Sequence, residues 1–389
     1  MLALVSAIGI LAPLLSRSAL AQPPAAPPGV PPAAINPAKP DDTALIAQGW
    51  LLLAQGGVTA ATERARDVLS RSPYSPAASA LAVEAEITRA GSGAGLTEYE
   101  RLLGARAFEE PLLLRRVSHA MLREAAAQVA DLRARLTALR ALAAAGDSAA
   151  SAELSAAMAE GNDTAARILA ENGNADAIKR LIDGINARIA DPVSTLKSLS
   201  KTRNAQTVTL AMKLLDDPRS EIRGAAIDAL GSMRAREAAP KLRTLLKDER
   251  PFLRVSAASA LMSMGDEAGL PLIQELATSE SAQARLDAAE ALASRKDAAW
   301  IEMVRKLTGA SEPEVRARAA RLIAPIDPQL SESVLAGLRA DPNPAVRTLA
   351  GGAELEAASS DLRALRRLLH SPGLEQRVLA AERVVQASR

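Results

Sequence analysis

The chain has 389 residues, with 47 Lys and Arg against 45 Asp and Glu, two His and no Cys. Without cysteine there are no disulfides, thiolate metal sites or thiol nucleophiles, and the nearly balanced charges indicate no polyanionic partner such as nucleic acid. Apolar residues make up 48% of the chain but only 2% are aromatic, so the core must pack with Ala, Leu, Val and Ile.

The amino-terminal segment, residues 1–21, predicts a signal peptide. An apolar run from Leu2 to Leu15 is followed by Ala19-Leu20-Ala21, which is small at the two positions that a signal peptidase reads. We therefore expect cleavage before Gln22, a periplasmic or secreted protein of a bacterial envelope, and no integral membrane segment after cleavage. The run is shorter than the roughly 18 residues that span a bilayer. An uncleaved anchor stays open as an alternative. No Lys or Arg precedes the run, which indicates either a weak signal or a start assigned too late.

Residues 22–40 are rich in proline, with eight prolines in nineteen residues. Proline blocks helix hydrogen bonding and favours the extended polyproline II conformation. We interpret this segment as a linker. A ligand for a proline-binding module is the alternative.

Residues 41–145 predict a helical region. From 43 to 73, the spacing of Gly49, Leu52, Ala61 and Val68, closed by Pro73, resembles one tetratricopeptide unit, with small residues where its two helices cross. This resemblance implies a helix pair, although one such unit is too short to be stable alone.

Two further features follow in this region. The glycines between Gly91 and Gly95 predict a flexible loop between helices, because a phosphate-binding loop needs a preceding strand and, in the Walker form, a Lys-Ser or Lys-Thr pair. From Pro111 to Ala145 the sequence predicts one uninterrupted helix, with Pro111 in its first turn, that bridges two arrays.

The carboxyl-terminal part is repetitive, with a period of 31 residues. Residues 146–216 contain about two degenerate units, and residues 217–389 contain clear ones. Alanine follows three residues after each repeated arginine, and a leucine series keeps the same step. The arginines are Arg223, Arg254, Arg285, Arg316, Arg347 and Arg377, the alanines are Ala226, Ala257, Ala288, Ala319, Ala350 and Ala380, and the leucines begin with Leu214, Leu245 and Leu276.

Each unit predicts two amphipathic helices. In the unit after residue 217, Ile222, Ala226 and Leu230 make an apolar stripe on the first helix, and Leu242 and Leu245 make one on the second. One helix pair cannot bury both stripes, so the units must stack. The predicted fold is all-α, a right-handed α-solenoid of stacked helix pairs. We expect the alanines at close helix contacts and the first helices on the convex side.

The run Asp217-Pro218-x-x-x-Ile222-Arg223-x-x-Ala226 resembles the short HEAT repeats, in particular the phycobilisome-lyase-like subclass. The resemblance implies that an aspartate six residues before each arginine helps to form a ladder between units. Asp217, Asp248 and Asp341 keep this residue, whereas Ser279, Ala310 and Ser371 replace it.

Function is predicted less specifically than fold. Neither His119 nor His370 has a nearby sequence partner that would orient it for catalysis, and we expect no catalytic, cofactor or metal site. The leading interpretation is a non-enzymatic exported scaffold that binds a protein partner. Arg243, Arg305 and Arg367, on equivalent second helices, are the expected partner-binding residues, although local ion pairs would explain these charges as well.

Two other functions stay open. The family resemblance implies a lyase-like enzyme subunit as one alternative. The other is a module that binds anionic envelope polymers through Arg363, Arg366 and Arg367, near the carboxyl end. Salt dependence of binding would distinguish the second from a protein scaffold.

Overall fold

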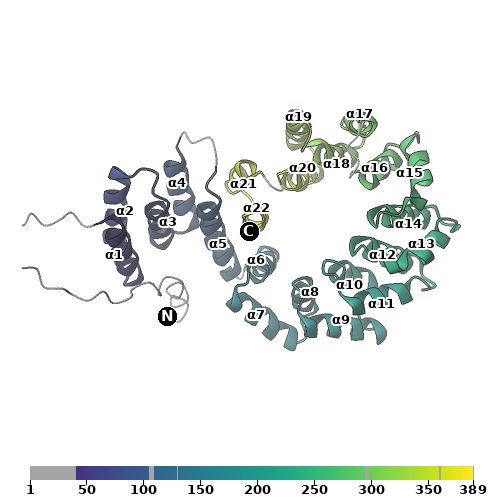
Figure 1. Ribbon diagram of the computed structural model, residues 1–389, viewed down its shortest axis with the longest axis horizontal. Coiled ribbons are helices and arrows are strands. Elements are labelled where there is room, and N and C mark those ends of the chain that lie inside the picture. Colours follow the sequence, from purple (N-terminus) through teal and green to yellow (C-terminus); the bar gives the residue numbers. More distant parts are fainter. Residues whose placement is uncertain (1–40, 105–108, 129, 294–297, 359–360, 389) are drawn as a thin grey trace, which may run out of the picture. The chain divides into compact units, whose positions relative to one another are not determined.

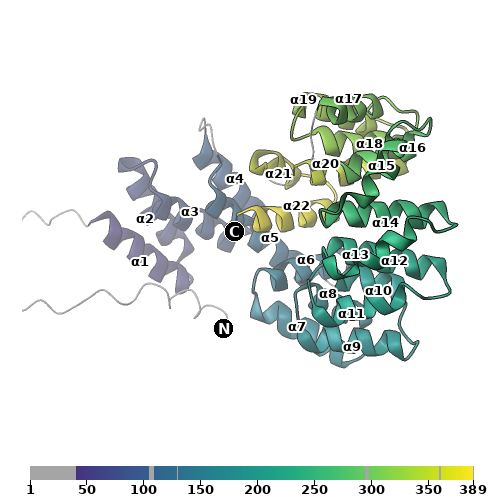
Figure 2. The ribbon, with the colours of Figure 1, turned by 45° about the vertical axis from the view of Figure 1, so that its right-hand side comes forward.

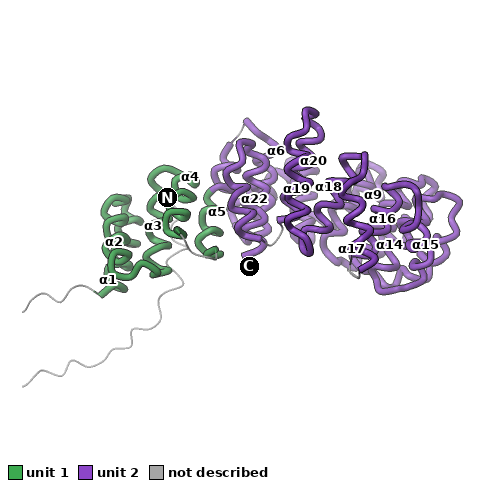
Figure 3. Tube along the Cα trace, turned by 90° about the horizontal axis from the view of Figure 1, so that it is seen from above, with its two compact units in different colours: residues 1–120 green, residues 121–389 purple. Residues whose placement is uncertain are grey.

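The computed structural model describes residues 41–104, 109–128, 130–293, 298–358 and 361–388. The expected signal peptide and Pro-rich linker lie outside these residues. All regular structure in the described ranges is helical. The chain divides into two compact units, residues 1–120 and 121–389 (Figure 3). In the part that the structure describes, no helix is both long and apolar enough to span a bilayer.

Unit 1 is built from consecutive antiparallel helices. They are α1 (Asp42–Ala54), α2 (Val58–Arg71), α3 (Pro76–Ala90), α4 (Ser92–Leu103) and the first part of α5 (Pro111–Ala127). Helices α1 and α2 form the expected pair, with Ala61 and Val68 fully buried. A Cβ on Gly49 would lie 2.3 Å from Cδ2 of Leu81 in α3 and 3.4 Å from Cβ of Arg64 in α2. The predicted small residue therefore lets three helices approach. The tetratricopeptide resemblance itself stays a prediction.

Two local predictions in this region are wrong. Residues 91–95 form no flexible loop, because Gly91 ends α3 with φ of 87° and α4 begins at Ser92. A Cβ on Gly95 would lie 2.3 Å from Cγ1 of Ile87, so this glycine serves close packing of α4 on α3. The helix expected from 111 to 145 is two helices. The second, α6 (Leu132–Ala144), starts where the Asp131 side chain accepts a hydrogen bond from the Ala134 N–H, since a capping aspartate satisfies backbone donors at a helix start.

Unit 2 is a curved array of helix pairs (Figure 1). Before the clear repeats come α6, α7 (Ser148–Ala159), α8 (Asp163–Glu171), α9 (Ala175–Asn186), α10 (Pro192–Leu199) and α11 (Ala205–Leu214). The repeats then give α12 (Ser220–Ser232), α13 (Ala239–Leu245), α14 (Pro251–Ser263), α15 (Leu270–Ala277), α16 (Ala282–Ala291), α17 (Ala298–Leu307), α18 (Pro313–Ile323), α19 (Pro328–Arg339), α20 (Pro344–Ala357), α21 (Leu362–Leu368) and α22 (Leu374–Ala387). The predicted all-α solenoid of stacked pairs is confirmed.

The even-numbered helices of unit 2 lie on the inner side of the curve, and the odd-numbered helices lie outside (Figure 1). The first helix of each repeat is therefore on the concave side, and the prediction of convex first helices is wrong. Successive inner helices pack on one another, as α12 does on α14 and α18 on α20.

The repeated alanines lie inside the stack, as expected. Ala226, Ala257, Ala288, Ala319 and Ala350 have no exposed surface, nor does Ala380. Each sits in an inner helix, and Ala288 and Ala319 belong to one hydrophobic cluster that includes Leu286, Val315 and Ile323. With little aromatic bulk available, small side chains let the helices approach until the aliphatic residues fill most of the remaining space.

Candidate functional site

The inner face of the repeats carries polar side chains in register. A step of 31 residues moves a position from one inner helix to the equivalent place on the next. Two such series face the concave side of α12, α14, α16 and α18. The first is Asp228, Ser259, Glu290 and Arg321, and the second is Ser256, Asp287 and Arg318.

These four helices enclose a groove of about 730 Å³. Its floor over α14 is formed largely by serine, with Val255 and Met262 beside it. Phe252 also lines the groove and is 47% exposed, in a chain that has two phenylalanines. The charged lining residues are Asp228, Arg234, Asp287, Glu290 and Arg318. The groove therefore combines an exposed aromatic ring with three carboxylates and two guanidiniums.

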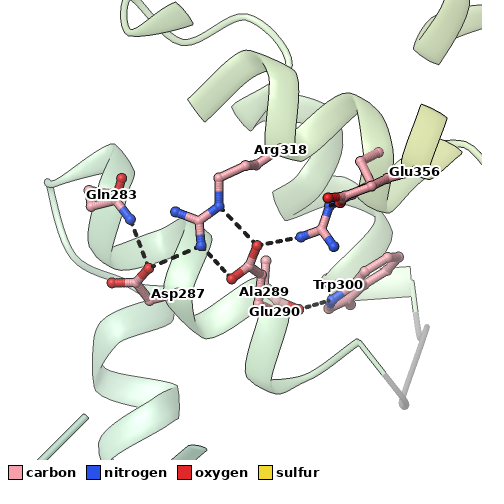
Figure 4. Close-up of polar contacts among 8 residues, drawn as sticks. Gln283, Asp287, Ala289, Glu290, Trp300, Arg318 and Glu356 are labelled. Atoms are coloured by element: carbon pink, nitrogen blue, oxygen red, sulfur yellow. Dashed lines mark hydrogen bonds and ion pairs between the residues drawn. The ribbon is translucent and has the colours of Figure 1, made fainter. Parts of the chain in front are cut away.

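A chain of ion pairs crosses one end of the groove (Figure 4). Arg318 Nε donates to Glu290 Oε1 at 3.0 Å, and Arg321 Nη2 donates to the same oxygen at 2.6 Å. Arg321 Nε lies 3.1 Å from Oε2 of Glu356 in α20. Two guanidiniums thus neutralise Glu290 and connect α16, α18 and α20.

Asp228 and Asp287 are held differently, on the two helices that flank α14. Asp228 accepts a hydrogen bond from the neutral Ser256 hydroxyl. The surrounding protein removes part of the water from the Asp228 carboxylate and so raises its pKa, although the residue keeps an exposed surface. Asp287 Oδ1 accepts from the neutral Gln283 amide at 2.8 Å, with the Arg318 guanidinium 3.9 Å away. Partial burial likewise raises the pKa of Asp287, because removing water disfavours a charged carboxylate. These two carboxylates keep more of their charge unbalanced than Glu290 does.

This face was not predicted, although the amino-acid sequence carries a signal for it. Charged residues recur at the 31-residue step on the first helices, as Asp228, Glu290 and Arg321 do. The first helices were expected on the convex side. The binding surface was therefore assigned to the second helices. The error lies in the assigned curvature, since the repeat register itself is correct.

The repeated arginines bind main-chain carbonyls in the loop before each inner helix. Arg285 Nη1 donates to the carbonyls of Ser279 at 2.7 Å and Glu280 at 2.8 Å. The other five make the same pair of bonds, to the residues six and five positions earlier. Because a carbonyl is present whatever the side chain, this contact persists in units where aspartate is replaced.

The aspartates of the expected ladder have a separate role. The Oδ1 atoms of Asp217, Asp248 and Asp341 each accept a hydrogen bond from the backbone N–H two residues later, and Ser279 Oγ does the same with the N–H of Ser281. These side chains stabilise the turn that leads into the inner helix. The structure thus assigns the arginines and aspartates to the connections within the array. The expected ladder between units stays a prediction.

The expected partner-binding arginines lie on the outer helices α13, α17 and α21, as the repeat register predicts. Arg243 Nη2 lies 2.7 Å from Asp266 Oδ2, and Arg305 Nη2 lies 3.3 Å from Asp327 Oδ2. Each aspartate also caps the start of the next unit's outer helical segment. Arg243 and Arg305 thereby connect successive units, whereas Arg367 is exposed on α21. Their role in partner binding stays a prediction.

The two histidines are in different units. His119 is half-buried in α5, and His370 is exposed after the end of α21. Within the described ranges, no group of three or more His, Asp or Glu side chains is arranged to hold a metal ion.

A sequence model of HEAT repeats matches residues 207–293 and 269–356. This part of the chain consists of HEAT repeats. The match begins within α11, ten residues before the predicted boundary at 217, and covers the groove helices. No curated protein matches the chain.

Several solved structures are similar to this chain. The complex of CpcE and CpcF of phycocyanin lyase from Nostoc sp. PCC7120 is 21% identical, with 60% of this chain and 96% of that chain covered and a TM-score of 0.37. Human deoxyhypusine hydroxylase in complex with glycerol is 20% identical, with 63% and 97% covered and a TM-score of 0.35. An engineered protein is 20% identical, with 90% and 99% covered and a TM-score of 0.28.

Proposed function

We propose that this protein is an exported, non-enzymatic scaffold of a bacterial envelope, and that its HEAT array holds an extended segment of a protein partner in the inner groove. Repeat arrays commonly bind proteins along extended concave surfaces. The observation that carries the proposal is the groove over α14, with Asp228 and Asp287 on its two sides and Phe252 exposed along it. An ordered row of polar side chains is what an extended backbone needs for hydrogen bonding.

The charges of the groove favour a basic side chain in the partner. Three carboxylates line it against two guanidiniums, and Glu290 is already paired with Arg318 and Arg321. A lysine or arginine between Asp228 and Asp287 would replace lost hydration with a charge-assisted hydrogen bond. An apolar partner residue beside it would cover Phe252.

Site-specific photocrosslinking tests this proposal in the native envelope. A photoreactive residue replaces Ser259 on the inner side or, as the matched control, the exposed Thr244 on outer helix α13. We expect one defined crosslinked partner from position 259 and none from position 244. The double variant Asp228→Asn and Asp287→Asn should abolish the crosslink while leaving helicity unchanged.

Partner binding at the outer arginines is the alternative hypothesis, and the same assay distinguishes it from binding in the groove. If Arg243, Arg305 and Arg367 form the binding surface, changing all three to glutamate abolishes capture and the inner variants do not. Capture from position 244, or loss of capture only in the arginine triple variant, would overturn the groove proposal and favour the outer edge.

Export is tested independently. Amino-terminal sequencing of the mature protein should start at Gln22, since Ala19 and Ala21 are the small residues of the expected cleavage site. A chain that begins at Met1 and fractionates with the cytosol would refute the envelope location without affecting the groove.

A further inference from the structure

The two ends of unit 2 are in contact. Helix α22 packs against α6 as well as against α21 and α20, and Figures 1 and 2 both show α22 beside α6. Arg377 and Ala380 place α22 in register with the other inner helices. Helix α6 therefore occupies the side of α22 where the inner helix of a following unit would stack. Unit 2 is a closed ring of helix pairs.

A half-buried ion pair lies at this junction. Arg140 Nε and Nη2 donate to the two carboxylate oxygens of Glu382 at 3.2 and 2.8 Å, across 242 residues of chain. Glu382 is only 8% exposed, and Gln386 Nε2 lies 3.4 Å from its Oε1. A second, exposed pair joins Arg133 Nε to Glu375 Oε1 at 2.9 Å. Both pairs connect α6 to α22.

This junction is of a kind that can open. Separating a buried ion pair loses the attraction between the two charges, but both charges regain their hydration. The regained hydration offsets much of the lost attraction, so the net free energy of opening the pair is small compared with the free energy of burying one charge without a partner. A junction held only by apolar side chains would gain nothing comparable on opening. The junction also joins helices that no connecting loop holds together, unlike the steps between successive units.

We propose that α22 is a latch that closes unit 2 into a ring through Arg140 and Glu382, and that the array opens at the α6–α22 junction to admit or release the segment held on its inner face. The closure follows from the packing of α22 on α6 and from the two ion pairs that connect these helices. Its use as a gate depends on the proposed binding in the inner groove. A partner held inside a closed ring is encircled, so it leaves only by threading or by opening of the latch.

Crosslinking tests closure without any partner. Since the natural chain has no cysteine, the pair Arg133→Cys and Glu375→Cys provides the only two thiols, and a bismaleimide should join them in high yield. The control pair Arg133→Cys and Arg243→Cys, with its second thiol on outer helix α13, should give no intramolecular product. A control-level yield from the first pair in a chain with full helicity would overturn the closed ring.

Charge exchange tests the latch. In the Arg133→Cys/Glu375→Cys chain, Arg140→Glu should abolish most of the crosslinking while circular dichroism stays unchanged, and adding Glu382→Arg should restore it. If Arg140→Glu reduces helicity, the milder Arg140→Gln is judged by the same criteria. Crosslinking at the original yield after either change means that this pair is not the latch. A failure to recover in the exchanged chain, with helicity intact, also counts against it.

Access to the groove tests gating. Ser259→Cys places the only thiol on the inner face, and its reaction rate is measured with a small maleimide and with a bulky polyethylene-glycol maleimide. Adding Arg140→Glu should accelerate the bulky reagent several-fold and leave the small one nearly unchanged. Equal rates of the bulky reagent in both chains would overturn gating, whereas a partner that fails to bind in the groove would leave these rates unaffected.

Discussion

Adding one carbon at Gly269 tests how closely the outer helices approach the inner ones. Gly269 ends the short 3₁₀ turn that precedes α15 and is buried, with ordinary helical φ and ψ of −79° and −17°. Its backbone thus allows alanine. A Cβ there would, however, lie 2.5 Å from the carbonyl oxygen of Ala258 and 2.8 Å from its Cα. Cβ contacts below 3.0 Å are essentially absent from proteins, so α14 and α15 must move apart by about half an ångström.

The expected cost of Gly269→Ala follows from this geometry. Overpacking typically costs about 1 to 3 kcal/mol, and the obstacle is backbone, which cannot rotate away as a side chain can. Replacing glycine recovers about 0.4 to 1 kcal/mol of unfolded-state entropy. We expect a net loss of about 1 to 2 kcal/mol, which corresponds to a midpoint lower by roughly 2 to 8 °C in thermal denaturation of a domain of this size.

Gly337→Ala is the matched control for the substitution. Gly337 lies inside α19, and no atom would come within 4 Å of its new Cβ. This variant should melt slightly above the natural chain, because alanine favours a helix over glycine by about 1 kcal/mol. Gly269→Ala melting at or above the natural chain would refute the close contact between the carbonyl of Ala258 and α15.

Three further predictions concern the array. Ala288→Leu should lower the free energy of unfolding by about 1 to 3 kcal/mol by overpacking, whereas Thr244→Leu on the exposed outer side should change it much less; equal denaturant midpoints would contradict the register. Arg285→Met keeps the aliphatic stem but removes two hydrogen bonds to carbonyls, so chemical denaturation should show a loss of about 1 to 2 kcal/mol, and an unchanged midpoint would deny these bonds a stabilising role. Folding raises the pKa of Asp228, so the charged carboxylate disfavours the folded state. At pH values above this raised pKa, Asp228→Asn should therefore stabilise the fold by about 0.5 kcal/mol or less, and the gain should vanish as the pH falls below the pKa of the unfolded chain. A gain that grows toward acid pH would contradict the raised pKa.

The repeat period predicted the packing because it reports spatial neighbours directly. Residues 31 apart occupy the same place in successive units, so Ala257 and Ala288 had to meet similar surroundings, and both are fully buried. The same logic connects Gly269 with Trp300, one period later. Trp300 Nε1 donates to the Ala289 carbonyl at 2.7 Å (Figure 4), at the position equivalent to the carbonyl that crowds Gly269. One place in the repeat thus takes a glycine or a hydrogen-bonded indole according to local spacing, which the period does not specify.

The candidate site was harder to predict because it depends on the direction of curvature. The pattern of two apolar stripes is the same whichever helix of the pair lies on the outside of the curve. Small differences in side-chain volume decide which row of helices is shorter and therefore lies inside. The polar residues that line the groove are ordinary solvated positions if their helix is convex, and a converging set if it is concave. Asp228 therefore becomes informative only once α12 is known to lie inside.

Ring closure is beyond sequence pattern for a further reason. The pairing of Arg140 with Glu382 joins residues 242 apart. Each unit turns the array by a small angle, and the position of the last helix is the sum of all these turns. A small change in that angle, repeated over the units, would carry α22 past α6 or leave it short. Arg140 and Glu382 restrict this sum, because their two hydrogen bonds form only in an array whose turns bring α6 to α22. The ion pair thereby selects one curvature among many that the same repeats would allow.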